Sequence, residues 1–134
     1  MMTKVMKVGI ISREDYAKRS IAIAKGKYTP RREEPNIWFE SLKSMSQVLS
    51  SDNQNLLKVI IDHKSRSLAE LEKLSDRKKS NLSRTLKTLE KYGIVELPKK
   101  EGKLVPRVMA TDFKVEFGLH YSKPVQNDQA NTAI

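Results

Sequence analysis

A face rich in basic and hydroxyl side chains is the part of this sequence best suited to binding a partner. On a helical wheel of about 100° per residue, Leu82, Leu86 and Leu89 fall on one side. Hydrogen-bond donors occupy the other side, its flanks and the preceding turn: Arg77, Lys78, Lys79, Ser80, Asn81, Ser83, Arg84 and Lys87. Such side chains donate to phosphate oxygens and to base edges in the major groove. They are therefore the candidate contacts with double-stranded DNA.

A second basic cluster follows this helical segment. Residues 98–104 carry Lys99, Lys100 and Lys103 around Gly102, a residue that permits a tight reversal of the chain. Lysines on such a turn suit phosphate contacts that carry no sequence information. We call residues 98–104 the wing and expect it to lie on the DNA backbone.

The residue types also exclude several kinds of chemistry. The chain has no cysteine, and its two histidines, His63 and His120, lie far apart in sequence. This excludes disulfides, cysteine-based metal sites and thiol catalysis, and it argues against a histidine-dependent triad. No glycine-rich phosphate loop or acid–base pair can be located. We expect no catalytic residue, metal site or cofactor, and hence no enzyme.

The positive charge is concentrated at the two ends of the chain. The 134 residues carry a net charge of +10. Residues 1–35 hold nine basic and four acidic side chains, residues 36–75 hold five of each, and residues 76–134 hold twelve and seven. This charge favours an anionic partner. The apolar runs are too short for a membrane span or a secretory signal, so we expect a cytoplasmic protein without a membrane partner.

The elements that must position the basic face follow from local signals. Asp52 is expected to cap a helix over residues 53–63, and Ser67 with Glu70 forms a capping box for a short helix. A longer helix over about 78–92 ends at Gly93, where a left-handed residue is favoured. Further segments are expected to be extended: 94–97, 104–110 and 113–117. The order predicts a mainly α fold with a small β-hairpin, a winged helix-turn-helix.

An N-terminal helical arm is expected before this unit. Ser12 and Gly26 bound a weakly apolar helix, residues 27–35 are irregular, and apolar residues recur at helical spacing over 36–49. Apolar residues of the arm need burial, either between two copies or against another protein: Tyr16, Ile23, Trp38, Phe39, Leu42 and Met45. The predicted division is an arm over 1–49 for dimerisation or docking, a DNA-binding unit over 50–117 and a flexible tail over 118–134.

Residues 53–110 resemble a known family. The pattern of a short helix, a turn and then Ser80, Ser83, Arg84, Leu86, Leu89, Gly93, Ile94 and Val95 resembles winged helix-turn-helix transcriptional regulators of the MarR/ArsR kind. That resemblance implies a recognition helix in the major groove. The first third of the chain does not match the usual MarR N-terminal helix. It resembles small prokaryotic regulators, some of which lie beside small toxin genes.

Three functions remain open on the sequence alone. The leading one is a sequence-specific DNA-binding transcriptional regulator that acts as a homodimer, because one recognition helix covers few base pairs. The alternative is an antitoxin-like protein that binds a small protein partner, such as a toxin, through the arm and autoregulates through its winged helix. RNA binding is the third, although no strand is rich in the aromatic residues that stack on single-stranded bases.

Overall fold

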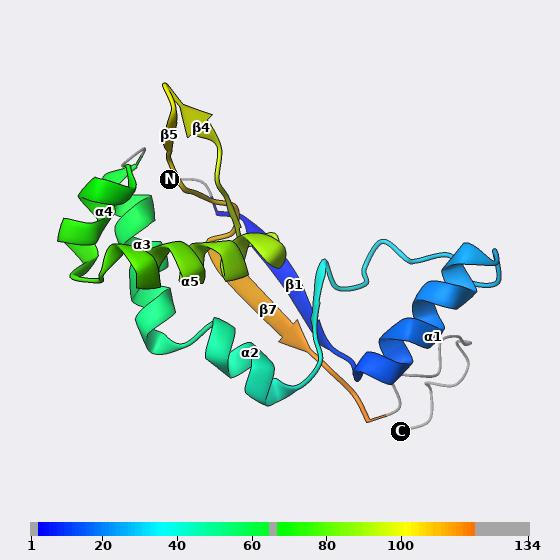
Figure 1. Cartoon of the computed structure of the whole chain (residues 1–134). Helices are drawn as coiled ribbons and strands as arrows, with labels where there is room; N and C mark the ends of the chain where they lie inside the picture. Colours follow the sequence, from blue (N-terminus) through cyan, green and yellow to red (C-terminus); the bar gives the residue numbers. More distant parts are fainter. Residues whose placement is uncertain (1–2, 65–66, 120–134) are drawn as a thin grey trace.

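The computed structural model describes residues 3–64 and 67–119. From residue 120 on, the predicted tail lies outside the described residues. The elements follow one another in the order β1 (Val5–Ile10), α1 (Arg13–Ala24), β2 (Ile37–Phe39), α2 (Leu42–Val48), α3 (Ser51–His63), α4 (Leu68–Ser75), α5 (Lys79–Lys91), β3 (Val95–Glu96), β4 (Lys99–Lys100), β5 (Lys103–Leu104), β6 (Arg107–Val108) and β7 (Asp112–Glu116). The described part of the chain is thus an α/β protein in which helices accompany small sheets and a hairpin (Figure 1).

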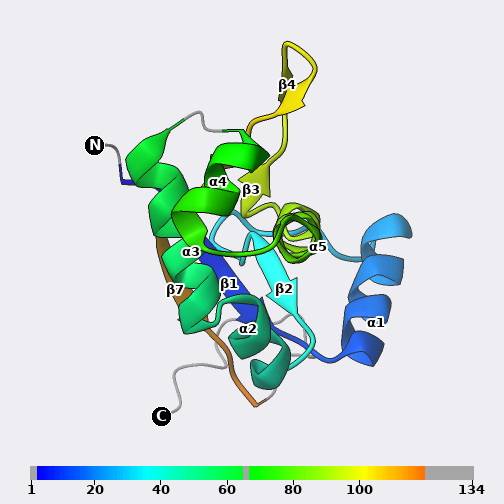
Figure 2. The same cartoon turned by 60° about the vertical axis from the view of Figure 1, so that its left-hand side comes forward.

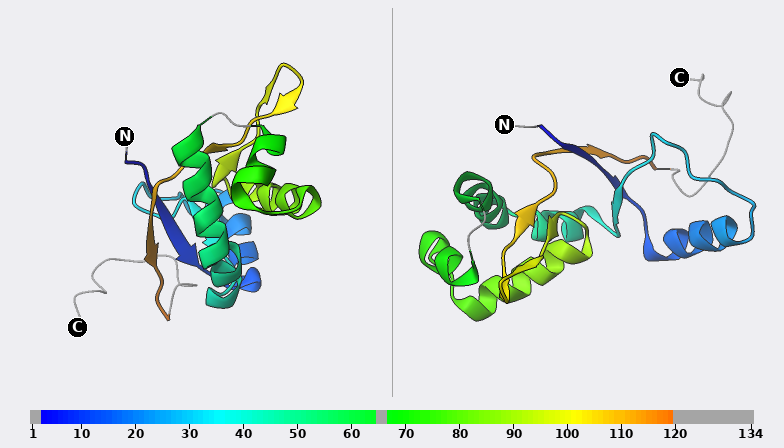
Figure 3. Two further views of the ribbon diagram at one scale, coloured as in Figure 1. Left: turned by 90° about the vertical axis from the view of Figure 1, so that its left-hand side faces the viewer. Right: turned by 90° about the horizontal axis from the view of Figure 1, so that it is seen from above.

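A parallel three-stranded sheet joins segments from the two ends of the sequence. Its strand order is β2-β1-β7, with Val8 in register with Ile37 and Val5 in register with Asp112. In the left view of Figure 3, α3 lies in front of the sheet and β7 lies at its border. The strand predicted over 113–117 is confirmed, whereas β1 was not predicted. The pairing of β1 with β7 connects the predicted arm directly to the predicted DNA-binding unit.

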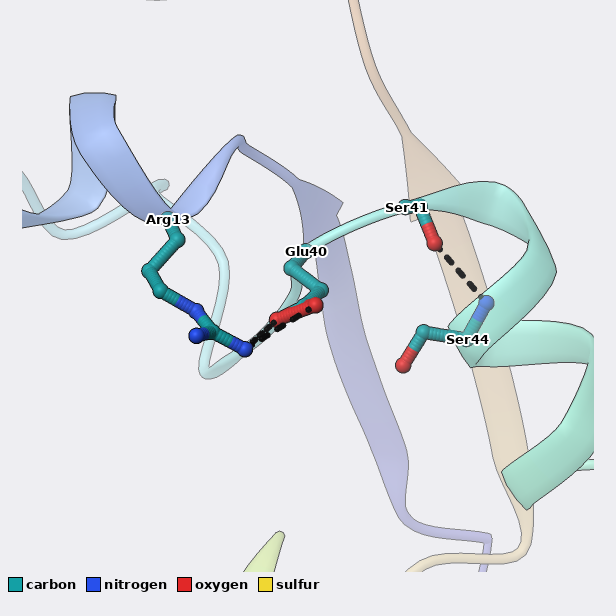
Figure 4. Close-up of polar contacts among 4 residues, drawn as sticks. All are labelled: Arg13, Glu40, Ser41 and Ser44. Atoms are coloured by element: carbon teal, nitrogen blue, oxygen red, sulfur yellow. Dashed lines mark hydrogen bonds and ion pairs between the residues drawn. The ribbon is translucent and has the colours of Figure 1, made fainter.

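The prediction of helical structure over residues 36–49 is wrong for the first part of that segment. Ile37–Phe39 pairs with β1 as a strand, and the helix begins only at Leu42. Ile, Trp and Phe are compatible with extended structure, and the pairing with β1 stabilises it there. Ser41 then caps the helix by accepting a hydrogen bond from the Ser44 N–H at 3.0 Å (Figure 4). Beside this cap, the Arg13 guanidinium donates to both carboxylate oxygens of Glu40, at 3.0 and 3.3 Å.

Helix α1 agrees with its predicted boundaries. The Ser12 hydroxyl accepts from the Asp15 N–H at 3.1 Å, and Gly26 has a φ of 74° just beyond the helix. No residue of α1 is buried. The helix therefore extends from the rest of the molecule, as Figures 1 and 3 show.

Helices α3, α4 and α5 follow one another as the sequence predicts, with one different cap. Ser50, rather than Asp52, caps α3 by accepting from the Asn53 N–H at 3.2 Å, and Asp52 lies in the first turn. The capping box of Ser67 and Glu70 is confirmed. Gly93 follows α5 with a φ of 78°, which confirms the predicted end of that helix.

The predicted hairpin is present but interrupted. Strands β3 and β6 pair at its base and β4 and β5 near its tip, and Pro98 and Pro106 lie between the two pairs. A proline cannot donate to the ladder, which explains the interruption. Glu101 and Gly102, both with positive φ, form the turn. The hairpin projects beyond α4 and α5 (Figure 2).

One apolar cluster joins the three helices, the base of the hairpin and the sheet. It contains buried residues from α3, α4 and α5, from Ile94 and Val95, and from the sheet residues Val8, Ile37 and Phe39. Helix α5 contributes the predicted seam of Leu82, Leu86 and Leu89. Among the described residues, no helix is both long enough and apolar enough to cross a membrane.

Candidate nucleic-acid interface

Helix α5 has one buried and one exposed face. Its leucine seam lies in the core, whereas the predicted contacts Lys79, Ser80, Asn81, Arg84 and Lys87 are exposed, as is Lys78 just before the helix. Ser83 lies at the border and is half-buried. In the part of the chain that the structure describes, no carboxylate forms an ion pair with Arg84 or Lys87. Both cations are therefore available to a partner.

The start of α5 carries charge of the unfavourable sign. Lys78 occupies the N-cap position without a side-chain cap hydrogen bond, and the first turn contains no acidic residue. A helix N-terminus presents free N–H groups and the positive end of the helix dipole, and it normally favours acidic side chains. Here Lys78 and Lys79 add positive charge to it. An anion at this helix start would compensate both the dipole and the lysines.

Arg77 is placed differently from the other predicted contacts. Its guanidinium donates to the Asp52 carbonyl oxygen at 2.7 Å, to Asn53 Oδ1 at 3.2 Å and to Thr85 Oγ1 at 3.5 Å. It therefore ties the turn before α5 to the start of α3 and to α5 itself. The sequence shows the charge of Arg77 but not these partners. The structure gives Arg77 a role in positioning α5.

Replacing Arg77 should therefore affect stability more than replacing its neighbour. Hydrogen bonds from a charged donor contribute about 1.5–3 kcal/mol, and we expect Arg77→Met to lower the free energy of unfolding by about 1–2 kcal/mol because the side chain is only half-buried. The matched control is Lys78→Met, which should change it by less than about 0.5 kcal/mol. Urea unfolding measures both. Equal losses in the two variants would contradict this role.

The hairpin presents a second exposed basic surface. Lys99, Lys100 and Lys103 are exposed, and the tip of the hairpin lies near the start of α4. A hollow between these two elements is lined by Ser67, Ala69, Glu70, Lys100, Glu101, Lys103 and Val105. At the base, Arg107 of β6 donates to Glu96 of β3 across the strand pair. That ion pair does not involve Lys99, Lys100 or Lys103, and the side chains of these three lysines are exposed to solvent.

The predicted interface residues of the arm are only partly exposed. Phe39 is 1% exposed and stacks on Tyr92 with ring centroids 4.4 Å apart, so its burial is completed within one chain. Met45 also packs partly against the core, and Ile23 is half-buried. Tyr16 and Leu42 are exposed. Three of the six predicted residues line one hollow of about 380 Å³ near the end of α5: Tyr16, Trp38 and Phe39.

An arginine–aromatic cluster in the arm was not predicted. The Arg19 guanidinium lies 5.0 Å from the Trp38 ring and 5.9 Å from the Tyr28 ring, and it donates to Glu34 Oε1 at 2.7 Å. Trp38 in turn lies against Gly9, where an added Cβ would be 2.8 Å from the ring. The cluster fastens the irregular segment between α1 and β2 onto the sheet. Its members lie too far apart in sequence to form a local pattern.

Among the described residues, no group of three His, Asp or Glu side chains is placed to hold a metal ion. The exposed face of α5 and the hairpin lysines present hydrogen-bond donors and positive charge to solvent, and such groups suit an anionic polymer.

The sequence model of the HVO_A0114 family matches residues 48–115, which is half of the chain, and the protein belongs to this family. The match runs from the end of α2 into β7 and so includes α3, α4, α5 and the hairpin. The comparisons with curated proteins and with solved structures gave no match.

Proposed function

We propose that residues 50–108 form a winged helix-turn-helix and that the protein is a sequence-specific DNA-binding transcriptional regulator. The order of α3, α4, α5 and the hairpin supports this proposal, since it is the element order of such domains. As part of the same proposal, the winged helix-turn-helix would be of the kind found in MarR/ArsR-like regulators.

The observation that carries the proposal is the start of α5. A helix that opens on two exposed lysines, lacks a side-chain cap and has no acid in its first turn forgoes stabilisation that an acidic residue would supply. A phosphate group at that position provides the missing negative charge and accepts from the free N–H groups. We therefore expect the first turn of α5 to lie against the DNA backbone.

The next turns of α5 would then read the bases. Asn81 pairs with adenine edges and Arg84 with guanine edges, while Ser80 can donate to either. Lys87 lies one turn beyond Arg84 on the same face and suits a phosphate or a guanine. The opposite seam of buried leucines fixes the orientation of this face relative to the rest of the domain.

The wing should contribute affinity without specificity. We expect Lys100→Ala/Lys103→Ala to weaken binding similarly on all duplexes, because phosphate contacts do not distinguish bases. Each lost contact should lower the slope of log affinity against log salt by about one unit. Titrations of one specific and one random duplex at several salt concentrations measure both effects. An unchanged slope would remove the wing from the contact surface.

Selection of duplexes from a random library tests the proposed function as a whole. We expect the full chain to enrich a defined sequence, and the enriched duplex to outcompete random DNA by about 10³-fold or more at fixed salt. A matched RNA duplex serves as the control, since its narrow major groove does not admit a helix. No enrichment, or equal binding to the RNA, would contradict the proposal.

A further inference from the structure

The outer edge of β7 is an exposed surface that lies outside the candidate nucleic-acid interface. In the strand order β2-β1-β7, no strand from the described residues lies beyond β7 (Figure 3). Val115 of this strand is 42% exposed, and Phe117, the first residue after the strand, is 51% exposed. An edge strand with exposed apolar side chains is a template for pairing with another strand.

The backbone of β7 determines which residues face that edge. Asp112 donates its N–H to the Lys4 carbonyl oxygen at 3.1 Å and thus directs its backbone groups toward β1. Because successive residues of a strand direct these groups to opposite edges, Phe113 and Val115 present theirs outward. Phe117, the next residue after the strand, does the same when β7 is extended by one residue. The side chains of Phe113 and Val115 lie on the face that also carries Met6 and Val8, their partners in β1.

The sequence along this edge is complementary to itself when it runs in the opposite direction. Residues 113–117 are Phe-Lys-Val-Glu-Phe. Antiparallel pairing of two copies about Val115 places Val115 opposite Val115 and Phe113 opposite Phe117. It also places Lys114 opposite Glu116, twice, on the other face of the sheet. Aromatic pairs and opposite charges directly across an antiparallel ladder are both stabilising.

The charges select this register over the one centred on Lys114, which pairs the outward groups of Phe113 and Val115. Centring the pairing on Lys114 would place Lys114 opposite itself and Asp112 opposite Glu116, and like charges directly opposite one another are destabilising. Centring it on Val115 removes both conflicts and covers the exposed Phe117. The same five residues thus supply backbone groups, apolar contacts and charge complementarity for one partner, a second copy of the chain.

We propose that the protein forms a two-fold homodimer by antiparallel pairing of β7 with β7 of a second copy. The sheet then continues through both subunits in the order β2-β1-β7-β7-β1-β2, and a single patch serves both chains, as two-fold symmetry requires. This interface differs from the arm interface expected from the sequence. It does not depend on DNA binding, and its test contains no DNA.

Charge reversal at the paired positions tests the proposal. Sedimentation equilibrium of the full chain at micromolar concentration should show a dimer. Lys114→Glu and Glu116→Lys each place like charges opposite one another, and each should raise the dimer dissociation constant about tenfold or more. Lys114→Glu should leave the subunit folded, because Lys114 lies in register with Lys7 of β1 and loses a like-charged neighbour.

Mixing the two variants separates pairing from a general effect of charge. A Lys114→Glu chain opposite a Glu116→Lys chain has only opposite charges at the interface, so the mixture should form a heterodimer as tight as the native dimer. The double variant Lys114→Glu/Glu116→Lys should dimerise with itself. Lys99→Glu, which makes the same charge change on the hairpin, is the matched control and should not alter assembly.

A backbone variant gives a readout that does not rely on charge. Val115→Pro removes an outward N–H while leaving the groups that face β1, so it should favour the monomer. Circular dichroism verifies that each variant is folded. A full chain that stays monomeric at micromolar concentration would overturn the proposal, as would a dimer unaffected by Val115→Pro and by both single charge reversals.

Discussion

Phe39→Ala is expected to lower the free energy of unfolding by about 3–5 kcal/mol, the usual cost of removing a buried aromatic side chain. Phe39 is 1% exposed, lies in register with Ile10 of β1 and stacks on Tyr92, the residue at the C-cap of α5. The substitution therefore removes the ring contact that joins the parallel sheet to the end of the proposed recognition helix. Urea unfolding followed by circular dichroism measures the effect.

The control for Phe39→Ala is Leu42→Ala, three residues along the chain. Leu42 is 46% exposed at the start of α2, so its replacement should cost less than about 1 kcal/mol. A double-mutant cycle with Tyr92→Ala isolates the ring contact, for which we expect a coupling energy of about 0.5–1.5 kcal/mol. Similar losses for Phe39→Ala and Leu42→Ala would contradict the burial of Phe39 in the core of one chain.

The helices that carry the candidate interface were predictable because their signals are local. The Ser67 capping box, the leucine seam of α5 and Gly93 each lie within a few residues of the element that they define. The exposed face of α5 follows from the seam alone. The helical period alone places four exposed residues on the side of α5 opposite the leucines, without any tertiary information: Ser80, Arg84, Lys87 and Lys91.

The parallel sheet could not be predicted in the same way. Strand β1 pairs with β7 across more than a hundred residues, and Val5–Ile10 lacks the alternation that marks a half-buried strand. The short apolar segment Ile37–Phe39 fits the helical spacing of the residues after it, so the apolar pattern does not distinguish a helix from a strand there. What decides between strand and helix there is the neighbouring β1, which the local sequence does not contain.

The sequence also does not show which of the predicted contact residues are free to contact a partner. The sequence gives Arg77 and Arg84 the same charge, but the structure engages Arg77 with Asp52, Asn53 and Thr85 and leaves Arg84 exposed. A prediction from residue type alone therefore includes residues that position the surface together with those that form it. For Arg84, exposure strengthens the proposed role and permits a direct test.

Reversing the charge of the exposed face of α5 is expected to remove most of the affinity for the selected duplex. Arg84→Ala should weaken binding to the selected duplex by about 1–3 kcal/mol, the usual contribution of one good base contact. Arg84→Glu/Lys87→Glu removes two donors and opposes phosphates with carboxylates, so we expect a loss of about 3–6 kcal/mol, close to nonspecific affinity. Fluorescence anisotropy with the selected and a random duplex at one salt concentration measures the loss.

The free energy of unfolding of these variants shows whether a loss of DNA affinity comes from lost base contacts or from a destabilised fold. Both side chains lie opposite the buried leucine seam, and within the described residues neither forms an ion pair, so the free energy of unfolding should change by less than about 0.5 kcal/mol. Lys58→Glu on the exposed side of α3 is the matched charge control and should cost far less affinity. If Arg84→Glu/Lys87→Glu bound the selected duplex as tightly as the native chain, α5 would not be the element that reads DNA.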